Sequence, residues 1–261
     1  MDDNYQTYLN RLARMSLPEA YKSQVQHIQE SAKFQPYSGT RQPAPFPGFT
    51  LITPPAAEDP SNSAFYTQLQ TYQQELLQLF VKDLIVPLPP ASFHLTVADL
   101  IWDHAFLDAS AKNPQFTEEL KIHIAETFEQ HQASLTQERE PIVWLLRGLI
   151  VMPRAVGICL IPKNEHSYEE IIQLRRRIYQ NPKLIALGIE QHYHFTAHIT
   201  LGYFGAIPPE LDRINLSNQI WELNQKLPLD FPEFIIKHVE LRQFDDMTNY
   251  YRQPNWPSLD L

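Results

Sequence analysis

Two stretches of the chain repeat one pattern, FHLTV at residues 93–97 and AHITL at residues 197–201. Each contains a histidine, an aliphatic residue, a threonine and a second aliphatic residue. Alternate residues of a β-strand face the same side of a sheet. The pattern therefore predicts two strands that each present a histidine and a threonine on one face, with the aliphatic side chains packed into a core behind them. The two predicted pairs are His94 with Thr96 and His198 with Thr200.

The second stretch overlaps another His-x-Thr match, HFTA at residues 194–197. In one long strand, His194, Thr196, His198 and Thr200 would all lie on the same face. The overlapping match ends on an alanine rather than on a larger aliphatic residue, and we therefore rank it below the match at His198. The register of this strand stays open at the level of sequence.

Around these stretches, hydrophobic patterns predict strands and helices in mixed order. The sequence does not alternate regularly between strand and helix, and apolar runs at 142–151 and 156–161 are joined by a short MPRA turn that is typical of a hairpin. This order favours the α+β class with antiparallel sheets. The other strands are expected at 49–53, 92–100, 197–204 and 234–244, and the helices at 61–80, 117–135, 167–179 (capped by Ser167) and 211–223.

The first 33 residues carry apolar side chains at helical spacing, interrupted at Pro18. Residues 34–48 are rich in proline and are expected to form a connector. We therefore predict a helical N-terminal appendage over residues 1–33 and one larger domain over residues 34–261.

Composition excludes several classes of protein. The formal net charge of −9 argues against binding to long nucleic acid, which requires many Lys and Arg contacts. No apolar run approaches the length of a membrane span, and the acidic, polar start is not typical of a signal peptide, so we expect a cytoplasmic protein without membrane contact. The single cysteine, Cys159, excludes a disulfide framework or a Cys-based zinc site, and we expect it to be buried. The 7 glycines form no phosphate-cradling loop.

The residue types of the two stretches suit acid–base chemistry on a phosphodiester. A histidine can take or give a proton near neutral pH, so two of them on opposite sides of a phosphodiester can serve as base and acid. A threonine hydroxyl can donate to a phosphate oxygen. This chemistry needs neither a metal nor another cofactor, and we predict none. A metal site built from His192, His194 and His198 is a weaker alternative, because no carboxylate in the sequence completes it.

These residues resemble the two-histidine (2H) phosphoesterase superfamily, which includes RNA 2′,3′-cyclic phosphodiesterases once called 2′-5′ RNA ligases. The resemblance rests on PPASFHLTV at 89–97 and FTAHITL at 195–201, about 100 residues apart, and covers most of residues 49–245. It implies a bilobal, pseudo-symmetric duplication, each lobe an antiparallel sheet with flanking helices and the active site in the central cleft. It also implies that His94 and His198 are the acid–base pair and that Thr96 and Thr200 bind the phosphate.

The chain departs from part of this family at one position. Some members carry an arginine five residues after the second motif histidine, where this sequence has Tyr203. A tyrosine can donate a hydrogen bond but carries no charge, so we predict that Tyr203 binds a small, mononucleotide-sized substrate. Arg147, Arg154 and the run at 175–177 are other candidate phosphate contacts, although a solvated helix face is the simpler interpretation of the run.

The resulting hypothesis is a metal-independent phosphodiesterase that hydrolyses 2′,3′-cyclic phosphates or related nucleotide phosphodiesters by two-histidine acid–base catalysis. Which histidine is the base stays open. The expected partner is a small nucleotide or RNA-end phosphodiester, and the expected oligomeric state is a monomer. The alternatives are a non-catalytic, AMP-like nucleotide-binding module on the same fold, 2′-5′ RNA ligase activity at the same site, and a metal hydrolase that uses the histidines at 192, 194 and 198.

Overall fold

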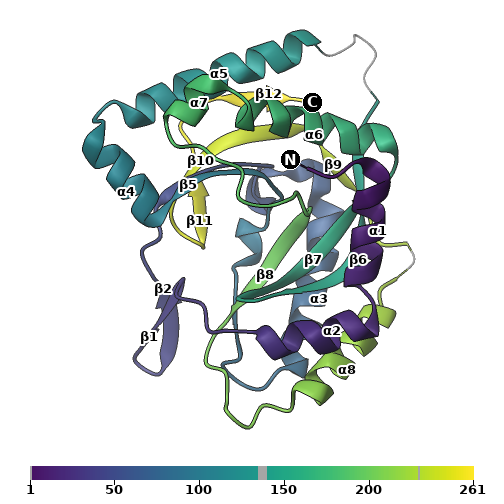
Figure 1. Cartoon of the computed structure of the whole chain (residues 1–261). Helices are drawn as coiled ribbons and strands as arrows, with labels where there is room; N and C mark the ends of the chain where they lie inside the picture. Colours follow the sequence, from purple (N-terminus) through teal and green to yellow (C-terminus); the bar gives the residue numbers. More distant parts are fainter. Residues whose placement is uncertain (1, 135–139, 229) are drawn as a thin grey trace.

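The computed structural model describes residues 2–134, 140–228 and 230–261. Within these residues the strands form two five-stranded sheets and a separate two-stranded hairpin, and every strand pair is antiparallel (Figure 1). Helices flank the sheets. The predicted α+β class with antiparallel sheets is confirmed.

Each sheet contains one of the two motif strands. The first sheet has the order β11-β10-β3-β5, with β12 also paired to β10, so that β5 lies at its edge. The second has the order β4-β8-β7-β6-β9, and β8 lies inside it. The strands of the first sheet are β3 (Gly48–Ile52), β5 (Thr96–Trp102), β10 (His238–Asp246), β11 (Asn249–Tyr251) and β12 (Ser258–Asp260); those of the second are β4 (Ile85–Pro87), β6 (Ile142–Met152), β7 (Ala155–Pro162), β8 (His198–Phe204) and β9 (Phe234–Ile236).

The predicted helices are present, and two more that were not predicted, α4 and α7, occur in the described residues. The last residue of the helix expected at 117–135 lies outside the described residues. The helices are α1 (Tyr5–Met15), α2 (Pro18–Gln24), α3 (Ser63–Leu79), α4 (Asp103–Lys112), α5 (Phe116–Ser134), α6 (Glu165–Tyr179), α7 (Pro182–Ala186) and α8 (Arg213–Gln225), with short 3₁₀ turns η1 (Val25–His27), η2 (Ala56–Glu58), η3 (Pro60–Asn62) and η4 (Pro90–Ser92).

The N-terminal cap of α6 differs from the prediction. Asn164 caps the helix, because its side-chain oxygen accepts the Ser167 amide at 2.9 Å. An asparagine in extended backbone conformation is a strong cap, and the helix therefore begins two residues earlier than Ser167. The Ser167 hydroxyl instead accepts the amide of Val143 on β6 at 3.0 Å and so holds the helix against the second sheet.

The predicted strand at 234–244 is broken at Lys237. Its first part, β9, pairs with β6 in the second sheet, and its second part, β10, pairs with β3 in the first sheet. The chain therefore passes from one sheet to the other at a single residue. The sequence suggested that this strand pairs with the hairpin of β6 and β7, and only β9 does so.

The N-terminal segment is helical, as predicted, but it is packed more closely than an appendage would be. Tyr8 and Leu12 of α1 and Tyr21 of α2 have no exposed surface and belong to the same hydrophobic core as the sheets. The proline-rich connector contains the hairpin of β1 (Phe34–Tyr37) and β2 (Thr40–Pro43), whose turn is formed by Ser38 and Gly39 with positive φ values of 45° and 79°. Among the described helices, none is long and apolar enough to cross a bilayer.

Candidate active site

His94 lies just before β5 rather than inside it. The ring Nδ1 of His94 is 2.7 Å from the carbonyl oxygen of Ser92. The strand begins only at Thr96, because Pro89 and Pro90 direct the preceding residues into the 3₁₀ turn η4. The Ser92 amide donates to the Pro89 carbonyl at 2.9 Å, and the Ser92 hydroxyl donates to the same carbonyl at 2.7 Å. The Ser92 carbonyl that accepts from His94 thus belongs to a turn that is closed by the bonds between Ser92 and Pro89.

His198 is the first residue of β8, and its ring is held in the same way. Its Nδ1 is 2.7 Å from the carbonyl oxygen of Thr196, two residues earlier. A carbonyl oxygen can only accept a hydrogen bond, so Nδ1 carries the proton in both histidines. In the neutral ring this leaves the lone pair on Nε2, the nitrogen that faces away from the backbone. Both side chains are partly exposed.

His198 lies close enough to His94 to affect the protonation of His94. The pKa of His94 is lowered to about 4, mainly because burial disfavours the charged ring, with further contributions from the charges of His198 and Arg242. The bond to the Ser92 carbonyl acts in the opposite direction. The ring of Tyr250 packs edge-on against His94 with 4.2 Å between the ring centroids. At neutral pH His94 is therefore uncharged and able to accept a proton.

Arg242 of β10 is a buried cation close to His94. It donates to Glu58 and Glu240 at 2.6 Å each, and its Nη1 donates to the carbonyl of Tyr250 at 2.9 Å. Its donors are therefore used within the protein, and it fixes the tyrosine that covers His94. No pattern of neighbouring residues indicates this role.

Thr96 and Thr200 follow their histidines by two residues, and both are partly exposed. Among the described residues, no hydrogen bond involves either hydroxyl. Both hydroxyls are thus available to a ligand.

A bulge brings Tyr203 to the face of β8 that carries His198 and Thr200. Thr200 pairs with Gly157 and Gly202 with Val156, so Leu201 is an extra residue and the alternation shifts by one. The Tyr203 hydroxyl donates to Met247 Sδ at 3.3 Å, and only 9% of the residue is exposed.

Lys33 brings a positive charge to Tyr203. Its Nζ lies 3.4 Å from the Tyr203 hydroxyl and 4.6 Å from the centre of the Phe46 ring. Lys33 precedes the β1–β2 hairpin and is 170 positions away from Tyr203 in the sequence. No pattern near either residue indicates this contact.

The alternative register of the second motif is wrong. His194 and Thr196 lie in the loop before β8, and the Thr196 hydroxyl accepts a hydrogen bond from Arg11 at 2.6 Å. The side chain of His194 is 61% exposed and 3.6 Å from Asp3. His192 instead packs against Trp102 with 5.0 Å between ring centroids.

The metal alternative depended on the same long strand. The three histidines of that alternative do not share a strand face, because the strand begins at His198. Within the described parts of the chain, no group of three or more His, Cys, Asp or Glu residues is arranged to hold a metal ion.

Among the described residues, no hydrogen bond or ion pair joins the side chain of Arg147 or Arg154 to the two motifs. Arg147 and Arg154 are exposed, whereas Arg175 is buried and bound within the protein. Cys159 is buried as expected, and burial raises its pKa to about 12. A surface hollow of about 490 Å³ lies against α5, α6 and α7; Arg177 of the run at 175–177 lines it, whereas the motif residues and Tyr203 do not.

Comparison with known families gives one match within the chain. The family model described as "2H-phosphodiest: Domain of unknown function (DUF1868)" matches residues 36–125, about a third of the chain. The matched region includes His94 and Thr96 and ends before the second motif. None of the curated proteins matches the chain.

Several solved structures are similar to this one. The crystal structure of the conserved protein of unknown function ATU0111 from Agrobacterium tumefaciens has a TM-score of 0.57 at 15% identity, over 89% of this chain and 96% of that chain. TT0787 of Thermus thermophilus has a TM-score of 0.43 at 17% identity, over 74% and 86%. Escherichia coli LigT complexed with 3′-AMP has a TM-score of 0.40 at 11% identity, over 84% and 96%. The chain thus shares its fold with ATU0111, and its residues 36–125 match the family model described as 2H-phosphodiest.

Proposed function

We propose that this protein is a phosphodiesterase that hydrolyses 2′,3′-cyclic phosphates, or related nucleotide phosphodiesters, with His94 and His198 as its acid–base pair. The proposal rests on one observation, which is that the two histidine rings make the same hydrogen bond. In each, Nδ1 is bonded at 2.7 Å to a carbonyl two residues earlier, which leaves Nε2 available for proton transfer. Two unrelated surface histidines would have no reason to share this arrangement.

The lowered pKa of His94 supports a role as the general base. A base has to be unprotonated before the reaction, and the pKa of about 4 keeps His94 neutral at physiological pH. In the proposed step, a water molecule transfers a proton to Nε2 of His94 while its oxygen forms a new bond to phosphorus. The P–O bond to one ribose oxygen breaks, and protonated His198 gives its Nε2 proton to that oxygen. The product is a phosphate monoester with a free ribose hydroxyl.

Thr96 and Thr200 are proposed to donate hydrogen bonds to the non-bridging phosphate oxygens. Each is on the same motif as a histidine, and neither hydroxyl is bonded within the described residues. Tyr203 and Lys33 are proposed to bind a further polar or anionic part of the substrate, because together they provide a hydroxyl and an ammonium group 3.4 Å apart. This set of donors requires neither a metal nor an organic cofactor.

A small substrate fits the charge of the chain. The net charge of −9 opposes the many phosphate contacts that a long RNA would make, whereas a few local donors suffice for one nucleotide or an RNA end. We further propose that the protein acts as a monomer in the cytoplasm.

The test is a panel of 2′,3′-cyclic and linear phosphodiesters assayed with purified protein in the presence of EDTA. We expect turnover of at least one cyclic phosphate, with a loss of about 10²–10⁴-fold on replacing either histidine by alanine. His194→Ala is the matched control, since it removes an exposed histidine from the adjacent loop and should retain activity. Wild-type turnover in both His94→Ala and His198→Ala would refute the mechanism.

The same panel separates the alternatives. AMP binding without any turnover would indicate a non-catalytic nucleotide-binding module. Formation of a 2′-5′ linkage from a cyclic phosphate and a hydroxyl end would indicate ligation at the same site. Loss of activity on adding EDTA would indicate a metal hydrolase.

A further inference from the structure

The three residues before His198 are held by the N-terminal segment. The amide of Phe195 donates to the Asp2 carboxylate at 2.7 Å, and its carbonyl accepts from Arg11 Nη2 at 2.6 Å. Arg11 Nη1 donates to the hydroxyl of Thr196 at 2.6 Å. The amide of Ala197 donates to the hydroxyl of Tyr8 at 3.1 Å. We call Asp2, Tyr8 and Arg11 the N-terminal clamp.

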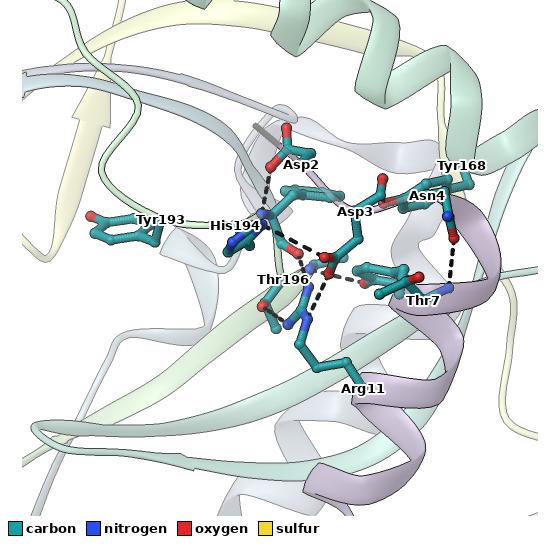
Figure 2. A network of polar contacts seen from close by, with 12 residues as sticks. Asp2, Asp3, Asn4, Thr7, Arg11, Tyr168, Tyr193, His194 and Thr196 are labelled. Atoms are coloured by element: carbon teal, nitrogen blue, oxygen red, sulfur yellow. Dashed lines mark hydrogen bonds and ion pairs between the residues drawn. The ribbon is translucent and has the colours of Figure 1, made fainter.

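Figure 2 shows how Arg11 projects from α1 toward the loop that precedes β8. Its guanidinium reaches Thr196 on one side and Asp3 on the other, and the Nε–Asp3 distance is 2.8 Å. Asp3 thus orients the guanidinium that holds the loop. The contact joins positions that are 185 residues apart in the sequence.

Asp2 is the acidic member of the clamp. Its side chain is 2% exposed, and it accepts hydrogen bonds from Arg175, Gln191 and the Phe195 amide. Burial alone would raise the pKa of Asp2, but the bonds and charge of Arg175 and the bond from Phe195 outweigh it, and the pKa is lowered. The carboxylate is therefore charged at neutral pH and holds its donors tightly.

Tyr8 completes the clamp with an oxygen that both donates and accepts. Its hydroxyl donates to the carbonyl of Leu160 on β7 at 2.9 Å while it accepts the Ala197 amide. Burial raises the pKa of Tyr8 far above its usual value, so the hydroxyl keeps its proton. It therefore joins the start of β8 to the neighbouring strand.

Arg175 extends the same network to the first motif. Its Nε donates to Asp2 at 2.8 Å, and its Nη1 donates to the carbonyl of Val97, the residue after Thr96, at 2.5 Å. Its guanidinium carbon also lies 4.7 Å from the centre of the Phe195 ring. One buried ion pair thus contacts the backbone next to both motifs.

The carbonyl that orients His198 belongs to Thr196, which lies in the middle of the clamped segment. If Phe195, Thr196 or Ala197 moved, this carbonyl would leave the line of the Nδ1–H bond, and the ring would lose its fixed proton position. We propose that the N-terminal clamp positions the imidazole of His198 and keeps its proton on Nδ1. The catalytic part of this inference rests on the proposed function, whereas the orientation of the ring does not.

The experiment pairs two clamp variants with two matched controls. Tyr8→Phe removes only the hydroxyl that holds Ala197, and Tyr21→Phe removes an equally buried hydroxyl that donates to Leu149 at 2.7 Å, away from the loop. Arg11→Gln removes the guanidinium, and Arg14→Gln changes an exposed arginine on the same helix. Tyr8→Phe retains the aromatic ring, so it remains informative even if Arg11→Gln does not fold.

The primary measurement is NMR of protein labelled with ¹⁵N in its histidine rings, recorded at a pH at which the rings are neutral, where it reports the nitrogen that carries the proton. We expect the His198 signals to shift toward a mixture of the two tautomers in Tyr8→Phe and Arg11→Gln, while His94 retains its Nδ1–H form in all four variants. A His198 signal that stays as in the unmodified protein in both clamp variants would overturn the proposal. This readout needs no turnover, so it gives an answer even if the proposed activity fails.

The second measurement is steady-state kinetics on the substrate found in the panel. A displaced acid should lower kcat by about 10–100-fold, as loss of a group that orients a functional histidine commonly does, and should leave KM within about twofold. The two controls should keep the kcat of the unmodified protein. Equal losses in Tyr8→Phe and Tyr21→Phe would indicate a general packing effect and overturn the positioning role.

Discussion

The segments before His94 and His198 reach the same ring geometry by different means. Both histidines bond Nδ1 to a carbonyl two residues earlier at 2.7 Å. For His94 the carbonyl belongs to Ser92, whose turn is closed within four residues by Pro89 and Pro90. For His198 it belongs to Thr196, which is held by the N-terminal clamp.

Both motif segments also bond to neighbouring parts of their sheets. The amide of Leu95, after His94, donates to the hydroxyl of Thr53 next to β3 at 3.0 Å, and the Thr53 amide donates back to the Leu95 carbonyl at 3.0 Å. The first motif is therefore supported by its own turn, by the residue after β3 and by the bond from Arg175 to Val97. The segment before the second motif is bonded to β7 and depends in addition on the N-terminal clamp, which is far away in the sequence. The two rings therefore have the same geometry although different contacts support it.

The strongest test of this comparison asks whether the two histidines contribute equally. We expect His94→Ala and His198→Ala each to lower kcat by about 10²–10⁴-fold, because each removes one proton transfer from the same step. The double variant should lose little more than the worse single variant, since residues that act as a unit are not additive. The measurement is kcat on a cyclic phosphate. Losses that multiply in the double variant would mean that the histidines act independently.

The second test compares the distant support with the local one. Asp2→Ala leaves the guanidinium of Arg175, with a side chain only 6% exposed, without its carboxylate, and we expect a loss of about 3–5 kcal/mol in the free energy of unfolding. Ser92→Ala removes one hydroxyl bond from the proline turn and should cost about 1 kcal/mol. Urea unfolding of both variants measures the difference. Equal losses would mean that the two supports do not differ in energy.

The third test uses pH, because the lowered pKa applies to His94. Below about pH 6.5 the unfolded chain binds a proton at His94 that the folded protein takes up only near pH 4, so the stability contributed by His94 falls as the pH falls through this window. We expect about 1–2 kcal/mol less stability at pH 5 than at pH 7 from this group. Unfolding of His94→Gln at both pH values measures the change, which should be smaller by that amount. If His94→Gln retains the full pH dependence, other groups are responsible for it.

The smallest expected effect concerns Lys33. We expect Lys33→Gln to raise KM by about 3–10-fold with little change in kcat, because a single partly exposed cation contributes about 1 kcal/mol to binding. The effect should decrease as salt is added. Lys22→Gln, an exposed lysine on α2, is the matched control and should behave as the unmodified protein. If the two variants have the same KM, Lys33 does not contact the substrate.

The sequence predicted the features that depend on neighbouring residues. The spacing of apolar residues and the turn residues were sufficient to predict most strands and helices. The two His-x-Thr stretches were visible because histidine, threonine and aliphatic residues alternate over five positions. The antiparallel class followed from the MPRA turn and the mixed order of elements. These signals are local, and tertiary contacts do not reverse them.

The rest depends on contacts between distant residues. Arg11 and Thr196 are 185 positions apart, and Lys33 and Tyr203 are 170 positions apart, so no window of sequence contains either pair. The strand at 234–244 has a continuous apolar pattern, and only the position of two different partner strands breaks it at Lys237. The register at His194 could not be settled either, because the residues that bond its loop, Asp2, Asp3 and Arg11, belong to the distant N-terminal segment.

The passage from β9 to β10 at Lys237 has a consequence for how the molecule can move. If one sheet rotated relative to the other, the two backbone dihedral angles of this single residue would have to absorb the rotation, or the ladder bonds of β9 or β10 would break. Domain closure normally takes place at a hinge of a few residues that are free of such bonds. We therefore expect ligands to rearrange side chains and loops rather than to change the angle between the sheets. The separation of the two histidines is then set when the chain folds and not when a ligand arrives.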